Sequence, residues 1–79
     1  MADSLQGRLD ASIDAMRTAR RLAHLTRQNA HDLPASYAYF MRESARHFRR
    51  ARSYLKDIRM YRAEIAYRLE QEARYARAA

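Results

Sequence analysis

The chain has 79 residues with one glycine, one proline and no cysteine, which excludes disulfides and thiolate metal sites. Sixteen lysine and arginine residues against nine acidic ones give a formal net charge of +7, so acidic surfaces are the favoured partners. A chain of this length forms one small domain, whose core stabilises it by only about 3–5 kcal/mol. We therefore expect self-association to reinforce the fold.

Residues 4–29 are predicted to form an amphipathic helix. Asp3 or Ser4 can cap it, because a side-chain oxygen there accepts a hydrogen bond from a free N–H group of the first turn. Apolar and small side chains recur at steps of three and four residues and form one stripe: Leu5, Leu9, Ile13, Met16, Ala19, Ala23 and Thr26. Charged residues such as Asp14, Arg17 and Arg27 occupy the opposite side, so one face of this helix is expected to be buried.

Residues 30–33 are predicted to form the turn. Asn29 suits a helix C-terminus, Asp32 suits an N-cap, and Pro34 is tolerated only in a first helical turn. A connection this short joins antiparallel neighbours. The predicted fold is therefore all-α: an antiparallel helical hairpin that assembles into a homodimeric bundle or coiled coil.

Residues 34–77 are predicted to form one long helix, because no glycine or proline follows Pro34. Its stripe follows a heptad pattern: Tyr37, Met41, Ser44, Phe48, Ala51, Leu55, Ile58, Ile65 and Leu69. At ~1.5 Å per residue this helix spans about 66 Å, and the first helix only about 39 Å. With the turn centred near His31, Leu5 is expected opposite Asp57, so the segment after Arg59 projects beyond the first helix.

The projecting segment continues the apolar stripe, and an isolated helix of this kind is marginal in water. We therefore expect it to pack against a second copy of the chain or against a target, through Tyr61, Arg62, Ile65, Leu69 and Tyr75. Arg62 stands where the heptad pattern expects an apolar residue, and so marks the end of the first helix's cover. Its guanidinium is expected to reach solvent, or Glu70 or Glu72 of the partner subunit.

Aromatic residues are predicted at two places along the long helix. Tyr37 and Phe40 are expected to close the core beside the turn, with Tyr39 pointing outward. Farther along, one heptad position beside the stripe is occupied by Tyr54, Tyr61 and Tyr75. Tyrosine suits both the edge of a helical core and a protein interface, so both interpretations stay open for these three.

Residues 42–59 carry seven cationic side chains and two acidic ones. On a helical wheel the cations fall away from Phe48, Leu55 and Ile58, as one outer face of the long helix. The residues predicted to contact a partner are Arg42, Arg46, Arg49, Arg50 and Lys56. Four interpretations stay open: a solvated helix face, a contact with an acidic protein surface, a contact with the phosphates of DNA or RNA, and a contact with a membrane surface. The helix lacks the tryptophan and the large apolar face of a membrane anchor.

Nothing in the sequence predicts catalysis, a cofactor or a metal site. Glu43 and His47 lie one helical turn apart, but this is not the i, i+3 spacing of di-iron bundles. A single pair of this kind is typical of a surface ion pair. The chain also has no glycine-rich phosphate loop and no nucleophile beside a base, so we expect it not to be an enzyme.

The remaining prediction concerns the function. No stretch approaches the ~20 consecutive apolar residues of a membrane span, and the N-terminus lacks the apolar segment of a signal peptide, so a cytoplasmic protein is expected. We expect a small non-enzymatic regulator of the kind that phages and mobile elements often carry: a basic homodimer that adapts or inhibits another macromolecule. A protein with an acidic surface is the favoured partner, and a nucleic acid is the alternative.

Overall fold

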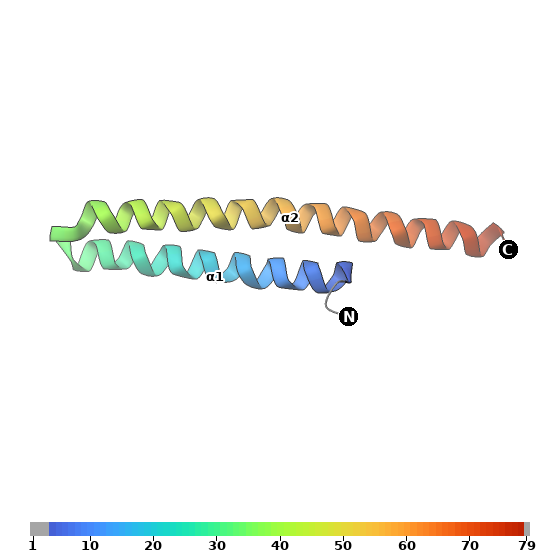
Figure 1. The fold of residues 1–79 in the computed structure, drawn as a ribbon, viewed down its shortest axis with the longest axis horizontal. Coiled ribbons are helices and arrows are strands. Elements are labelled where there is room, and N and C mark those ends of the chain that lie inside the picture. The colour runs from blue at the N-terminus through green and yellow to red at the C-terminus, as the bar shows by residue number, and fades with distance from the viewer. Residues whose placement is uncertain (1–3, 79) are drawn as a thin grey trace.

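The computed structural model describes residues 4–78 as two long helices lying side by side in opposite directions (Figure 1). Helix α1 spans Leu5–Asp32, the short 3-10 helix η1 spans Pro34–Ser36, and helix α2 spans Tyr37–Ala78. No strand occurs in this range. The all-α prediction is confirmed, and the two helices form a hairpin.

Helix α1 begins with a capping hydrogen bond. The Gly7 N–H donates to Oγ of Ser4 at 2.9 Å, and Ser4 itself has an extended backbone. This bond satisfies one of the amide donors that a first helical turn leaves free. Ser4 is thus the cap, and the other candidate, Asp3, lies outside the described residues.

The predicted boundaries of the turn are wrong by a few residues. Helix α1 continues past Asn29 to Asp32, so Asp32 ends α1 and does not cap the next helix. Leu33 follows, and its N–H donates to the Asn29 carbonyl at 2.9 Å. Pro34 opens η1, where its fixed φ is tolerated. The physical reason lies at Ala30, which is fully buried: packing here outweighs the preference of asparagine for a helix end.

The core is a narrow seam between the helices. The buried residues among positions 4–78 are Leu9, Ala19, Ala23, Ala30, Ser44, Ala51 and Ile58. Most are alanine or serine, and such small side chains let two helices approach closely. The Ser44 hydroxyl donates across the seam to the Ala23 carbonyl at 2.8 Å. Phe48 and Leu55 are only half-buried, so the predicted buried line of Phe48, Leu55 and Ile58 holds fully for Ile58 alone.

The register of the hairpin fixes how far α1 covers α2. Because Ala23 lies level with Ser44, Leu5 lies level with Arg62, and not with Asp57 as predicted. Residues 63–78 of α2 extend past the start of α1, and we call this segment the overhang (Figure 1). It gives the Cα trace its elongated extents of 68 × 20 × 13 Å.

Candidate binding surfaces

One broad side of the hairpin carries most of its unpaired positive charge. The His24 and Phe48 rings meet edge to face across this side, with centroids 5.3 Å apart. Residues at helical spacing from these two rings share their side. On α1 these are Arg17, Arg20 and Arg27, and on α2 they are Arg52, Lys56 and Arg59. Arg49 joins the α2 row, because it stands three residues before Arg52 and seven before Lys56. We call these seven residues the basic side.

The basic side has the properties of a binding surface for an acidic partner. All seven side chains are exposed, and none forms an ion pair with another residue of positions 4–78. Neither row contains an aspartate or glutamate between Arg17 and Arg27 or between Arg49 and Arg59, and Asp10, seven residues before Arg17, is the first acidic residue in line with the α1 row. Arg27 of α1 lies level with Phe40 of α2, so the two rows together extend over the length of α2 from Phe40 to Arg59. At ~1.5 Å per residue this length is about 28 Å. Like charges held this close repel each other, so an acidic surface that covers them lowers the electrostatic energy.

The five basic residues predicted from the sequence do not form one surface. Arg49 and Lys56 lie on the basic side, and the exposed Arg42, seven residues before Arg49, continues their row toward the turn. Arg46 forms an ion pair with Glu43 at 3.3 Å. Arg50 is exposed at the seam between the helices, on the other side of the hairpin, so it does not belong to the predicted outer face.

Three residues of the basic side were missed because they belong to α1. Arg17, Arg20 and Arg27 follow the same three- and four-residue spacing as the basic row of α2. The sequence therefore shows a row of regularly spaced cations within each helix. It does not show which side of α1 lies beside which side of α2, and only the register of the hairpin joins the two rows.

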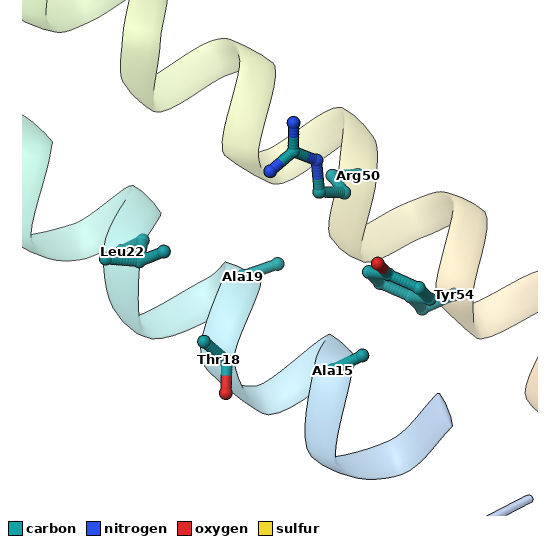
Figure 2. Close-up of a pocket in the computed structure, with 6 residues that line it drawn as sticks. All are labelled: Ala15, Thr18, Ala19, Leu22, Arg50 and Tyr54. Atoms are coloured by element: carbon teal, nitrogen blue, oxygen red, sulfur yellow. The ribbon is translucent and has the colours of Figure 1, made fainter. Parts of the chain in front are cut away.

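The opposite side of the hairpin contains a hollow of about 220 Å³. Figure 2 shows its lining residues, which are Ala15, Thr18, Ala19 and Leu22 of α1 with Arg50 and Tyr54 of α2. Ala15, Thr18, Ala19 and Leu22 come from α1 on one wall of the hollow, and Arg50 and Tyr54 come from α2 on the other. Leu22 is 41% exposed at the edge of the hollow.

We call this surface the hollow side and define it by two rows at helical spacing. The rows are Ala11, Ala15, Thr18 and Leu22 on α1, and Glu43, His47, Arg50, Tyr54, Asp57 and Tyr61 on α2. Arg8, three residues before Ala11, continues the α1 row. With it the hollow side carries two arginines and two acidic residues, so it is nearly neutral. The Nδ1 atom of His47 is buried with no hydrogen-bond partner among the described residues.

The overhang is a single exposed helix held by local ion pairs. Arg68 contacts Glu64 at 3.1 Å and Arg74 contacts Glu70 at 2.9 Å, both at i, i+4 spacing. Pairs of this kind stabilise a helix by only about 0.3–0.5 kcal/mol each. Among the residues predicted to form an interface here, Leu69 is 60% and Tyr75 78% exposed.

The other three residues of that predicted interface lie at the base of the overhang. Tyr61 is half-buried because α1 reaches farther along α2 than predicted, and Ile65, three residues past the level of Leu5, is half-buried as well. Arg62 is exposed and lies level with Leu5, the first residue of α1. It therefore stands where the cover of α1 ends.

The aromatic residues beside the turn differ from the prediction. Tyr37 is 45% exposed and does not close the core, and its ring lies 6.0 Å from that of His31. Phe40 is half-buried and meets the exposed Tyr39 edge to face at 5.3 Å. Because the first three residues after Leu33 form η1, Tyr37 starts α2 at the rim of the hairpin and not inside it.

The Glu43 and His47 pair that the sequence singled out does not form an ion pair among the described residues. The sequence spacing suggested an ion pair between Glu43 and His47. In the structure Glu43 pairs with Arg46 instead. No three histidine, aspartate or glutamate side chains between residues 4 and 78 are placed to hold a metal ion. Neither helix contains, within the same range, an apolar stretch long enough to cross a membrane.

Comparison with known proteins adds no identification. No protein-family model, no curated protein and no solved structure matches the chain.

Proposed function

We propose that the chain is a small non-enzymatic binding module that works as a homodimer and docks its basic side onto an acidic surface of another protein, whose activity it thereby modulates. The observation that carries this proposal is the set of seven exposed cations without an ion pair among the described residues. A hairpin needs polar side chains on its outer surface, but it does not need them all to be of one sign.

Exposed apolar side chains next to the basic side favour a protein as the partner. Met60 and Tyr67 stand four and eleven residues after Lys56, so they continue the same side of α2 beyond the basic residues. Met60 is 56% and Tyr67 58% exposed. Tyrosine, methionine and arginine are the residues enriched at protein interfaces, where an apolar centre is bordered by charges.

The test compares two variants that lose the same charge. The first variant replaces three residues of the basic side with glutamine: Arg52, Lys56 and Arg59. The matched control replaces three arginines at or beyond the end of the α1 cover: Arg62, Arg68 and Arg77. Proteins that the wild type captures from a lysate of its host are identified by mass spectrometry, and binding is then measured with the purified candidate partner.

We expect the basic-side variant to bind at least about tenfold more weakly than the control, because each lost contact with an acidic group costs on the order of 1 kcal/mol or more. Met60→Ser together with Tyr67→Ser should also weaken binding. Equal affinities of the two triple variants for every captured protein would contradict the proposal.

A nucleic acid is the second candidate partner, because a row of cations about 28 Å long can follow a phosphate backbone. If seven phosphates are neutralised, the affinity for mixed DNA or RNA should fall by roughly three to five orders of magnitude between low and physiological salt. Binding of this kind should be lost in the basic-side variant and unaffected by Met60→Ser and Tyr67→Ser. No retention of DNA or RNA at low salt would exclude this candidate.

A further inference from the structure

We propose that the hollow side is the surface through which two copies of the chain associate, with Arg50 of each copy facing Asp57 of the other. The first argument is the separation of charge across the hairpin. The basic side carries seven cations, whereas the hollow side, Arg8 included, carries two arginines and two acidic residues. Two copies can therefore approach through their hollow sides without strong repulsion, while approach through their basic sides is opposed.

The available area also favours the hollow side over the overhang. Helix α1 has 28 residues, so the paired part of the hairpin is about 42 Å long at ~1.5 Å per residue. With a width of 20 Å this side offers roughly 800 Å² per copy, which is the size typical of a stable interface. The overhang, about 24 Å of one helix ~10 Å thick, offers only roughly 240 Å².

The arrangement of charges on the hollow side indicates a two-fold axis. Arg50 and Asp57 lie two helical turns apart on the same side of α2, and Tyr54 stands between them. When two α2 helices cross in opposite directions beside Tyr54, each Arg50 meets an Asp57 and each Asp57 meets an Arg50. A parallel arrangement would place Arg50 beside Arg50, so the charges select the antiparallel one.

The hollow supplies the shape that such an interface requires. Its volume of about 220 Å³ is lined by Ala15, Thr18 and Ala19 on one wall and by Arg50 and Tyr54 on the other (Figure 2). A cavity of ~150 Å³ holds a benzene-sized ring. The hollow is therefore large enough to accept an aromatic side chain, and Tyr54 of the partner subunit is the ring nearest to the axis.

This inference specifies how the homodimer of the proposed function is built, and in that respect it rests on the proposed function. In the antiparallel dimer the two basic sides point away from each other and the two overhangs project at opposite ends. The dimer interface and the basic side share no residue. Failure of dimerisation and failure of partner binding are consequently separate results.

The experiment measures the molar mass of the purified chain by light scattering and the dimer affinity by analytical ultracentrifugation. The wild type should have twice the chain mass of 9.3 kDa. Arg50→Asp places two acidic groups together and Asp57→Arg places two arginines together, so each variant should dimerise about tenfold more weakly or worse. The double variant Arg50→Asp/Asp57→Arg restores opposite charges across the axis and should regain the dimer.

Mixing the two single variants gives a second readout. The Arg50→Asp chain has acidic groups at both positions and the Asp57→Arg chain has arginines at both, so their mixture should form a heterodimer. Arg52→Asp, a charge reversal on the basic side, and Leu69→Asp, in the overhang, should leave the dimer intact. Circular dichroism of each variant checks that its helices are formed.

Four results would overturn the inference. These are a monomeric wild type, an assembly larger than two chains, a folded double variant that does not recover the dimer, and loss of the dimer in Leu69→Asp with retention in Arg50→Asp. The last result would assign self-association to the overhang instead.

Discussion

Arg49 and Arg50 are neighbours in the sequence but lie on opposite sides of the hairpin. Arg49 belongs to the basic side, whereas Arg50 lines the hollow with Tyr54. A helical wheel of α2 alone places both on an outer face, because it contains no information on the position of α1. The assignment of these two arginines to different surfaces follows from the packing of α1 against α2.

We predict that the two arginines have separable effects. Arg49→Asp should weaken binding of an acidic partner by about tenfold and leave the dimer unchanged. Arg50→Asp should weaken the dimer and leave the intrinsic affinity for the partner unchanged. Ultracentrifugation and partner titration on the same two variants check this, and an identical pattern of losses in both would contradict it.

Ser44 is the one polar residue in the buried seam of the described hairpin, and its position in the stripe was predictable from its heptad spacing. The role of Ser44 could not be predicted from the sequence, because its hydroxyl donates to the carbonyl of Ala23, 21 residues away. The closeness of the two helices at this level depends on Ser44 and Ala23 both being small.

Substitution of Ser44 should therefore depend on size. Ser44→Ala removes one hydrogen bond and should lower the free energy of unfolding by about 0.5–1.5 kcal/mol. Ser44→Leu forces the helices apart and should cost more, about 1–3 kcal/mol. Urea unfolding followed by circular dichroism measures both, and a Ser44→Leu variant as stable as the wild type would contradict close packing here.

At the scale of the elements, the two helices and the cap at Ser4 were predictable, because hydrophobic periodicity and N-capping are local properties of the sequence. The residue at which α1 ends could not be predicted in this way. Asn29 and Asp32 carry the usual signals of a helix boundary, but the burial of Ala30 against α2 extends α1 beyond them. This tertiary contact shifts the register, and the overhang becomes shorter than the sequence indicated.

The overhang should be the least protected part of α2. Its residues lack a neighbouring helix, so their backbone amides open without breaking the seam. Hydrogen exchange followed by mass spectrometry should show residues 66–78 exchanging at least about tenfold faster than residues 44–58. Equal protection of the two segments would mean that another surface covers the overhang in solution.

At the scale of the whole molecule, the hairpin separates its charges. Composition predicted a positive molecule with acidic partners, and it could not predict that the cations of two helices gather on one side while the hollow side is nearly neutral. This separation supports both proposals, because one side remains available for a partner and the other for a second copy of the chain.

The most direct test of this separation is the salt concentration at which the protein elutes from a heparin column. Two glutamine variants are compared, one of Arg52, Lys56 and Arg59 and the other of Arg62, Arg68 and Arg77. Each loses three charges, so net charge alone predicts equal elution. We predict that the first elutes at clearly lower salt, because clustered cations dominate binding to a polyanion. Elution of both triple variants at the same salt concentration would contradict the claim that the basic side is the binding surface.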